Sequence, residues 1–395
     1  MRIDSVSARS TNDTRGRATI ETAISSAGFI ATASVPSGKS TGIHEALELR
    51  DADGSVTRAI ENVNTEIKDA LCGRDFASLD EIDTLLIELD GTPNKSRLGA
   101  NAILSVSIAA QRLLAAQEGV PLWKSIAKRG GTTPSAPRLY MNVMNGGTHA
   151  DFKLPFQEYI LVVEGEPAEA FSIAQEAFAK LGERLGNVPM GDEGGYAPTF
   201  ATLEEPFEIL ADLVKEFPHT FIAIDAAASE FFQEGTYQML GKSYTADDMT
   251  HIYESLVSHF PLESIEDPFD EESGDDFARL TTALGPNIRV IGDDLTVTNP
   301  IRVKEALLRK EINTVLIKPN QVGTVMEALQ AVKETYAAGC GVVASHRSGE
   351  TSDTFIADFA YGVGAYGIKA GGLGQRERLE KYERLLAIEQ EANIV

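Results

Sequence analysis

The chain has 395 residues, of which 43% are hydrophobic, and it carries 59 acidic against 35 basic side chains, for a formal net charge of −24. This hydrophobic content excludes a disordered chain, and at this length it favours a large barrel or two domains. The acidic balance disfavours nucleic acid and anionic membranes as partners, and an anionic substrate could bind only where cations invert the local field.

The two cysteines, Cys72 and Cys340, lack the spacing of zinc ligands and are too few for a disulfide framework. No charged leader with an apolar core opens the chain, and no apolar run approaches the roughly 20 residues of a membrane helix. We therefore expect an unprocessed, soluble protein of the reducing cytoplasm.

The first third of the chain has the pattern of a small α+β domain. Alternating apolar and polar residues predict strands at 3–10, 19–24 and 28–35, and helical spacing predicts helices at 59–71 and 100–117. Glycine, proline and small polar residues then gather at 128–137, which indicates a linker. We expect a capping domain over residues 1–127 and a second domain over 138–395.

The second domain has short apolar strands that alternate with longer amphipathic stretches, as βα units do. Six strands are expected, each ending in a polar residue and following the last by about one strand–helix unit. This regularity favours a closed (β/α)8-type barrel. A doubly wound sheet is the rival, but it usually carries a glycine-rich first turn, and no GxGxxG occurs. The six strands are expected at residues 221–225, 264–266, 289–293, 314–318, 342–346 and 366–369.

Three of the strand ends are carboxylates: Asp225, Glu266 and Asp293. The carboxyl ends of barrel strands meet at one rim, so these side chains are expected to converge. Three hard oxygen ligands suit Mg²⁺, with water or substrate completing the octahedron.

The other three strand ends are Lys318, Lys369 and His346. A lysine beside divalent cations can have its pKa lowered enough to act as a base. His346 precedes Arg347 and Ser348, a cluster of donors that suits a phosphate or carboxylate. Taken singly, an acid at a strand end is more often a cap and a lysine is more often solvated. Six polar ends at one rim instead favour an active site.

Several long motifs also resemble those of the enolase family along nearly the whole chain. They are VPSGKSTG at 35–42, NKSRLGANAIL at 94–104, NGGTHA at 145–150, QE at 157–158, GDEGG at 191–195, SIEDPF at 264–269, DDLTVTNP at 293–300 and SHRSGET at 345–351. The resemblance implies an enolase-type barrel with an N-terminal capping domain. It also implies a homodimer or larger homo-oligomer, with the small domain against a neighbouring barrel.

The resemblance implies a Mg²⁺-dependent phosphopyruvate hydratase, a lyase of glycolysis and gluconeogenesis. Such an enzyme reversibly dehydrates 2-phosphoglycerate to phosphoenolpyruvate through an aci-carboxylate intermediate, and enolase-superfamily sites pair a lysine or histidine base with one or two Mg²⁺ ions. By the same resemblance, Lys318 is the base and Glu193, supported by Glu158, is the acid. Asp225, Glu266 and Asp293 hold the first of two Mg²⁺ ions, and Ser40 with the substrate phosphate holds the second. His149, Gln157, His346 and Lys369 contact the substrate, and Arg347 and Ser348 bind its phosphate.

Some positions depart from the family pattern. Lys39 stands where enolases usually have alanine; it is either a solvated side chain, which we favour, or an extra cation near the phosphate. Asp151 and Phe152 replace smaller residues. Further departures are Ala370-Gly371-Gly372-Leu373 and Arg17-Ala18.

These departures keep two alternatives open: an enolase paralogue that acts on a phosphoenolpyruvate analogue, and a non-catalytic, enolase-like binding protein. Gly38-Lys39-Ser40 also resembles the end of a P-loop. That pattern requires glycine at position 33, where this chain has Ala33, so a nucleotide-binding ATPase is rejected.

Overall fold

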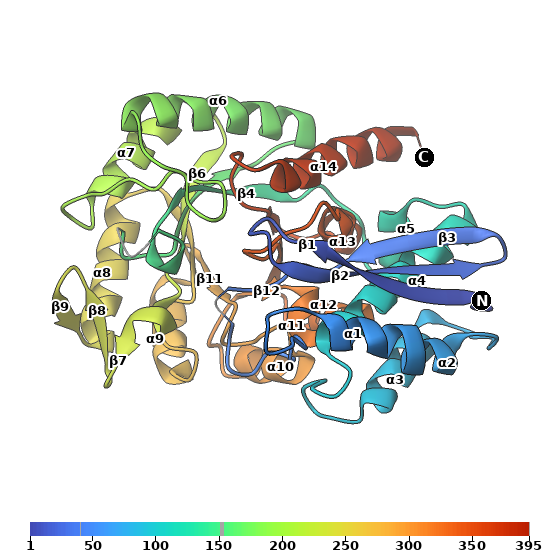
Figure 1. Ribbon diagram of the computed structural model, residues 1–395. Coiled ribbons are helices and arrows are strands. Elements are labelled where there is room, and N and C mark those ends of the chain that lie inside the picture. Colours follow the sequence, from blue (N-terminus) through green and yellow to red (C-terminus); the bar gives the residue numbers. More distant parts are fainter. Residues whose placement is uncertain (40, 151–153, 395) are drawn as a thin grey trace.

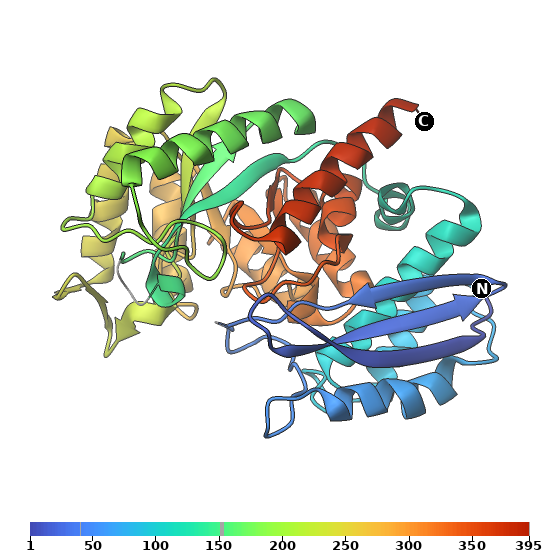
Figure 2. The same cartoon turned by 45° about the horizontal axis from the view of Figure 1, so that its top comes forward.

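The computed structural model describes residues 1–39, 41–150 and 154–394. Eight strands form a closed barrel, and a separate three-stranded sheet from the start of the chain lies beside it. The blue N-terminal sheet lies on one side of the barrel strands, and the small sheet β7–β9 lies on the opposite side (Figures 1 and 2). The barrel confirms the predicted fold class and excludes the doubly wound rival.

The N-terminal sheet consists of β1 (Ser5–Asn12), β2 (Ala18–Ser26) and β3 (Phe29–Ser34), antiparallel and in that order. These are the three predicted strands, with bounds shifted by one or two residues. Helix α4 (Ala100–Glu118) packs against β2 and β3 and ends at Gly119, whose φ of 65° favours glycine. The alanine-rich sequence of α4 allows this close approach to the sheet.

The predicted helix at 59–71 is continuous in direction but changes its hydrogen-bond pattern. It consists of α1 (Thr57–Asn62), a π-helical turn η1 (Val63–Ile67) and α2 (Lys68–Leu71). Two further helices, α3 (Leu79–Asp90) and α5 (Leu122–Gly130), complete this part of the chain. Because α5 continues to Gly130 and the first barrel strand begins at Arg138, the limits of the linker at 128–137 stay a prediction.

All six predicted barrel strands are present. They are β6 (Thr220–Asp225), β10 (Leu262–Glu266), β11 (Arg289–Gly292), β12 (Thr314–Ile317), β13 (Gly341–Ser345) and β14 (Gly367–Lys369). Two strands were not predicted, β4 (Arg138–Asn145) and β5 (Glu158–Val163), and both are almost fully buried. Strand β5 runs antiparallel to both of its neighbours, so its first residue, not its last, lies at the rim where the other strands end.

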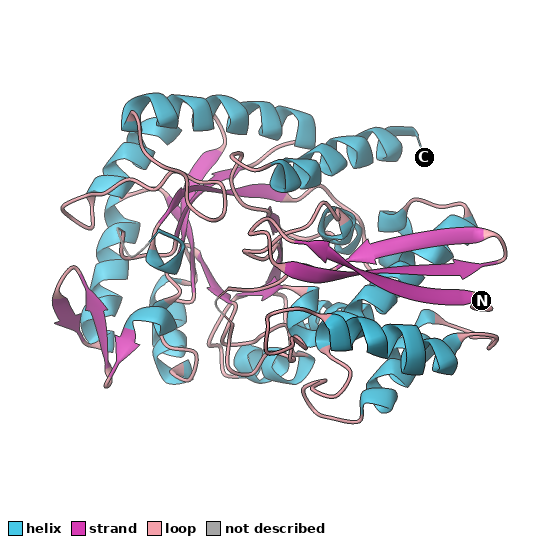
Figure 3. Ribbon diagram, in the orientation of Figure 1, coloured by secondary structure: helices cyan, strands magenta, loops and turns pink. Residues whose placement is uncertain are grey.

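Alternating side chains from the strands fill the barrel, which is a packed core and not a pore. Figure 3 shows the magenta strands of the barrel with cyan helices around them. The opposite faces of the strands pack against helices. Those after β5 are α6 (Pro167–Leu185), α7 (Glu205–Val214), α8 (Ala246–His259), α9 (Gly274–Leu284), α10 (Pro300–Leu308), α11 (Pro319–Val322), α12 (Val325–Ala337), α13 (Phe355–Val363) and α14 (Arg376–Ile394). Short elements are η2 (Gly147–Ala150), η3 (Ala228–Phe231), β7 (Phe232–Gln233), β8 (Thr236–Met239) and β9 (Lys242–Tyr244). None of the described helices is long and apolar enough to cross a bilayer.

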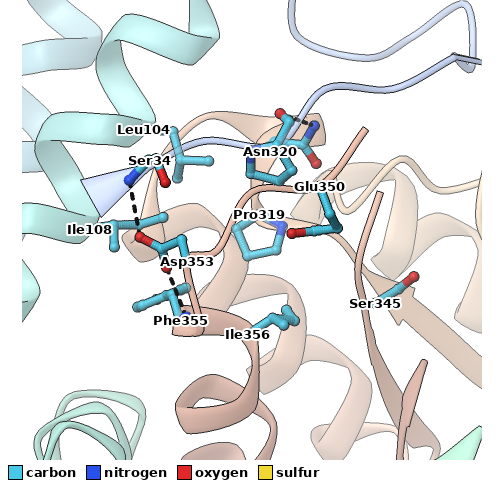
Figure 4. A pocket seen from close by; sticks show the side chains of 11 residues that line it. Ser34, Leu104, Ile108, Pro319, Asn320, Ser345, Glu350, Asp353, Phe355 and Ile356 are labelled. Carbon is cyan, nitrogen blue, oxygen red and sulfur yellow. Dashed lines mark hydrogen bonds between the residues drawn. The ribbon is translucent and has the colours of Figure 1, made fainter. Parts of the chain in front are cut away.

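Asp353, from the loop before α13, joins the N-terminal sheet to the barrel. Its carboxylate accepts two hydrogen bonds from Arg112 of α4, at 2.6 and 2.7 Å, and one from the backbone NH of Ser34 at 3.0 Å. The residue lies at the edge of a small cavity between β3, α4 and the barrel (Figure 4). Burial raises the pKa of Asp353, but the charge and hydrogen bonds of Arg112 outweigh burial and leave the pKa below its ordinary value.

Arg112→Ala should therefore destabilise the protein strongly, because it leaves a buried carboxylate without its cation. We expect the free energy of unfolding to fall by roughly 3–5 kcal/mol. Arg9→Ala is the matched control: it removes a guanidinium that pairs with Glu21 but is 77% exposed, and it should cost about 1 kcal/mol or less. Denaturant titration of both variants measures the difference, and equal losses would contradict a joining role for the Arg112–Asp353 pair.

Candidate active site

The barrel register brings the predicted polar residues to one level at the rim. Asn145 pairs with Glu158, Glu158 with Asp225, and Asp225 with Glu266 across adjacent strands. A small cavity at this rim, with about 290 Å³ of empty space, combines carboxylates, cations and amide groups. Its lining consists of His149, Gln157, Glu158, Glu193, Asp225, Lys318, Ser345, His346, Arg347, Ser348 and Lys369.

Lys369 lies at the centre of this arrangement. Its Nζ is 2.8 Å from Glu266 Oε1, 2.9 Å from Asp225 Oδ2 and 3.1 Å from Glu158 Oε1, and all four side chains are buried. Burial disfavours the ammonium, but the three carboxylates outweigh burial and hold the pKa of Lys369 well above its ordinary value. One lysine thus links three strands that come from distant parts of the sequence.

Lys318 follows β12 and forms a short ion pair with Asp293. Pro319 begins α11 directly after it, which ends the strand, and the NH of Lys318 donates to Thr298 Oγ1 at 2.8 Å. Burial lowers the pKa of Lys318, but the charge of Asp293 outweighs burial and raises it above its ordinary value. The described residues therefore hold Lys318 as a cation whose partner would have to change before it could accept a proton.

Asp293 is held from two sides. Gln321 donates to its Oδ1 at 2.8 Å, and the backbone NH of Asp293 donates to Asp267 Oδ1 at 2.9 Å. The other oxygen of Asp267 accepts from the NH of Asp294 at 2.8 Å, so Asp267 fixes the start of this loop. Carboxylates that bind metal ions are usually hydrogen-bonded by neighbouring groups, as Asp293 is by Gln321.

The donor set at the rim fits Mg²⁺ by charge and chemistry. Asp225, Glu266 and Asp293 offer only oxygen ligands, and burial together with the charge of Asp225 raises the pKa of Glu266 well above its ordinary value. A buried excess of carboxylates is the environment that a divalent cation neutralises. Among the described residues, two other sets bring one possible ligand atom each within 4.8 Å of one another: Glu158, Glu193 and His346, and Asp267, Asp293 and Asp294. The predicted trio is not one of these sets, and lysine ammonium groups lie against its carboxylates.

Glu158 and Glu193 form a buried carboxyl pair with opposite pKa shifts. Burial and the charge of Glu193 raise the pKa of Glu158, whose Oε2 has no hydrogen-bond partner among the described residues. Burial also opposes ionisation of Glu193, but the neighbouring groups His149, His346 and Arg378 outweigh burial and hold its pKa well below the ordinary value. Asn142 of β4 donates to Glu193 Oε2 at 3.0 Å. These opposite shifts favour a protonated Glu158 beside an ionised Glu193.

The loop that carries Glu193 is fixed against the end of β4. The NH of Gly195 donates to Asn145 Oδ1 at 3.1 Å, and the NH of Gly191 donates to the carbonyl of Gly195 at 2.8 Å. A Cβ at Gly191 would lie 2.4 Å from Asn145 Cβ. The glycine of this motif is therefore needed for close approach.

His149 and Gln157 enter the cavity from the other side. His149 Nε2 is 3.5 Å from Glu193 Oε1, and Gln157 Nε2 donates to Asp225 Oδ2 at 3.3 Å. Lys39 reaches the same loop: its Nζ is 2.7 Å from Asp192 Oδ2 and 2.9 Å from the carbonyl of Thr148. The imidazole of His149 and the ammonium of Lys39 hold the pKa of Asp192 at about 2.

The sequence favours a solvated side chain for Lys39, and this prediction is wrong, because the side chain forms an ion pair. It is 40% exposed but pairs with Asp192, the residue before the predicted acid. Ser40, to which the resemblance assigns a metal-binding role, lies outside the described residues, as do Asp151 and Phe152, which depart from the family pattern.

Arg347 and Ser348 lie at the end of the cavity nearest the N-terminal part of the chain. Arg347 donates to both oxygens of Glu45, at 2.8 and 3.1 Å, and to Asn320 Oδ1 at 3.3 Å. Burial opposes its charge, but Glu45 outweighs burial and raises the pKa of Arg347. Arg15 donates to Ser348 Oγ at 3.4 Å. Glu45 thus holds the guanidinium in a fixed plane.

Sequence reasoning missed several residues that support the site: Asn142, Asn145, Asp192, Asp267, Gln321, Glu45, Arg15 and Arg378. Two of them left a signal. Asn142 interrupts an apolar strand, and Arg378 occupies the stripe that also carries the buried Tyr382 and Leu385 on α14. A polar residue at a core position indicates a buried hydrogen-bond network.

Comparison with known proteins gives the same result over both parts of the chain. Residues 3–126 match the family described as "Enolase, N-terminal domain", and residues 134–394 match "Enolase, C-terminal TIM barrel domain". A curated protein of Methanopyrus kandleri named enolase is 43% identical over 411 aligned positions, covering 99% of this chain and 96% of that protein. The enolase of Methanocaldococcus jannaschii is 42% identical with the same coverage.

Lys369→Met should lower the free energy of unfolding by roughly 3–5 kcal/mol in the absence of metal, because three buried carboxylates lose their cation. Carboxyl groups whose pKa is raised on folding stabilise the folded state at low pH and lose that contribution as pH rises through the folded value. Since the pKa values of Glu158 and Glu266 are raised, the loss should be smaller near about pH 5 than near about pH 8.

Denaturant titration in EDTA at both pH values measures this loss. Lys180→Met is the control, because it removes a half-exposed ammonium that pairs with Glu216 at the surface. A loss in Lys369→Met that is as small as the control, or that does not depend on pH, would contradict this electrostatic account.

Proposed function

The chain belongs to the enolase family and has its phosphopyruvate hydratase activity, and from this premise we propose that Lys318 and Glu193 carry the chemistry at the barrel rim. The enzyme is a lyase that dehydrates 2-phosphoglycerate to phosphoenolpyruvate. The observation that carries the assignment of residues is the meeting of base, acid pair, carboxylates and anion donors in one small cavity.

Lys318 accepts the proton from C2 of the substrate. It lies at the rim on the ordered strand end of β12, with its backbone fixed by Thr298 and its amine beside Asp293. When bound, Mg²⁺ would supply positive charge that draws Asp293 away from Lys318, lowering the pKa of this lysine, and that stabilises the charge on the substrate carboxylate. Lys369 adds a permanent positive charge next to Asp225 and Glu266.

The Glu158–Glu193 pair supplies the proton that turns the leaving C3 hydroxyl into water. The two carboxyl groups share one proton, which Glu193 delivers and Glu158 holds in the resting arrangement. Asn142 keeps the second oxygen of Glu193 in place. Base and acid therefore act on adjacent carbons: one proton is taken from C2, and one is given to the hydroxyl that leaves C3.

The remaining donors orient the substrate. Arg347 and Ser348 bind its phosphate, and Glu45 holds the guanidinium plane of Arg347. His149, Gln157 and His346 contact the rest of the substrate. Positive charge at this rim attracts a phosphorylated acid to a protein whose net charge is −24.

We assign two Mg²⁺ ions to the site, the first at Asp225, Glu266 and Asp293 and the second at Ser40 with the substrate phosphate. The oxygen donors and the buried excess of carboxylates support the first position, and only the sequence motif supports the second. The paralogue and the non-catalytic alternative are not favoured, because the relatives named enolase match over 99% of the chain.

We assign residues 1–127 to a capping domain and 138–395 to the catalytic barrel, with 128–137 as the linker. We also assign a homodimer in which the small domain packs against a neighbouring barrel. Ile30 of β3, which is 73% exposed, is an apolar side chain of the small domain that such a contact would cover. Sedimentation velocity tests this arrangement, and a monomer at all concentrations would overturn it.

Mg²⁺-dependent formation of phosphoenolpyruvate from 2-phosphoglycerate, followed by ultraviolet absorbance, tests the assignment. Lys318→Ala should lower kcat by at least about 10²–10⁴-fold, the range for removal of a general base. Lys215→Ala on the exposed end of α7 is the matched control and should keep the activity of the parent protein. Full activity of folded Lys318→Ala would overturn the assignment of the base.

A further inference from the structure

Arg378 of α14 is fully buried directly behind the candidate active site. All of its nitrogen atoms are engaged: Nε donates to Gln375 Oε1 at 2.7 Å, and Nη2 donates to the carbonyls of Ser348 at 2.9 Å and Asp192 at 3.3 Å. Nη1 donates to His346 Nδ1 in a short hydrogen bond and to the carbonyl of Arg347 at 3.4 Å. The side chain therefore connects the loop that carries Glu193 to the loop that carries Arg347 and Ser348.

The contact with His346 determines which ring nitrogen carries the proton. A guanidinium has only donors, so the nitrogen that faces it must offer a lone pair. His346 Nδ1 is therefore unprotonated, and a neutral ring carries its proton on Nε2. The backbone NH of His346 donates to the carbonyl of Lys369 at 2.8 Å, which holds the residue at the rim.

The surroundings of His346 also oppose a second proton. It is buried, and the charged groups that face it are Arg378 from α14, Lys369 from β14 and Lys318 after β12, against Glu193 and Glu158. Burial and the charge of Arg378 lower the pKa of His346 well below its ordinary value, although Glu193 acts in the opposite direction. The local charge and the hydrogen bond thus favour the same protonation state.

Three groups at this point could hold the proton for the leaving hydroxyl, because Glu158, Glu193 and His346 each bring one atom within 4.8 Å of the others. We propose that Arg378 is a positioning residue that keeps His346 neutral with its proton on Nε2, so that His346 donates a hydrogen bond to the substrate but does not deliver the catalytic proton. The proton then stays with the Glu158–Glu193 pair. This inference rests on the proposed function and narrows its acid to that pair.

The direct test is nitrogen-15 NMR of histidine-labelled protein without substrate, between about pH 5 and 8. The chain has six histidines, and the signals of His346 are assigned by their absence from His346→Gln. We expect the shift of an unprotonated nitrogen at Nδ1 and of a protonated one at Nε2 throughout this range. Titration of His346 near its ordinary pKa, or a proton on Nδ1, would overturn the proposal.

Variants of Arg378 test cause and effect. Arg378→Gln removes the charge, so the titration of His346 should move upward by at least about one pKa unit. The acid limb of the kcat profile should not follow the titration of His346, because the proton comes from the Glu158–Glu193 pair. Arg378→Lys keeps a charge and a donor and should leave His346 neutral. Arg376→Gln, on the exposed side of the same helix, is the matched control and should change neither measurement.

The outcomes separate this inference from the proposed function. If His346 has the expected tautomer but the protein does not dehydrate 2-phosphoglycerate, the function fails and the role of Arg378 stands. If the enzyme is active and His346 titrates normally, the role of Arg378 fails and the function stands. Should Arg378→Gln not fold, the wild-type spectrum alone decides the protonation state.

Discussion

The ammonium of Lys369, surrounded by the carboxylates of Glu158, Asp225 and Glu266, is the interaction on which the rest of the rim depends. Three buried carboxylates would repel one another without a cation, and a single lysine at the end of β14 joins them. Because these residues come from β5, β6 and β10, the ion cluster also fixes the relative level of strands that are far apart in the sequence. The contacts that hold these strands at one level are therefore also contacts of the site.

The same arrangement explains how an acidic protein handles an acidic substrate. Several buried carboxylates at the rim lie against a lysine or another carboxyl group: Asp293 against Lys318, Asp225 and Glu266 against Lys369, and Glu193 beside Glu158. Some of these ion pairs must break and form with other partners before catalysis can occur. A base such as Lys318 becomes available only when Asp293 has another partner, so metal binding and base activation are linked through one carboxylate.

The sequence contained much of this site because strand ends are easy to locate. Six strands end in polar residues, and barrel topology brings such residues together. The sequence alone therefore predicts one rim for Asp225, Glu266, Asp293, Lys318, His346 and Lys369. Strands β4 and β5 were not predicted, because both are buried along almost their whole length. In β5 the polar residue, Glu158, is also the first residue of the strand and not the last. Its antiparallel direction, which no local pattern reveals, brings Glu158 to the rim.

Long-range partners could not be predicted for a related reason. Glu45 and Arg347 are 302 residues apart. Arg378 occupies a buried stripe of α14, which indicates its burial but does not identify His346 as its partner. Lys39 was expected to be solvated, because nothing in its neighbourhood in the sequence points to Asp192. Such pairs depend on how the N-terminal part and α14 pack against the barrel, and that packing follows from the whole fold.

The most direct test of the central claim, that Lys318 is the base and the Glu158–Glu193 pair the acid, is exchange of the C2 hydrogen of 2-phosphoglycerate with solvent deuterium. The account predicts that Glu193→Gln still exchanges this hydrogen in the presence of Mg²⁺ although it forms little phosphoenolpyruvate, whereas Lys318→Ala loses exchange and product together. Exchange that persists in Lys318→Ala, or disappears in folded Glu193→Gln while Lys318 is intact, would contradict it.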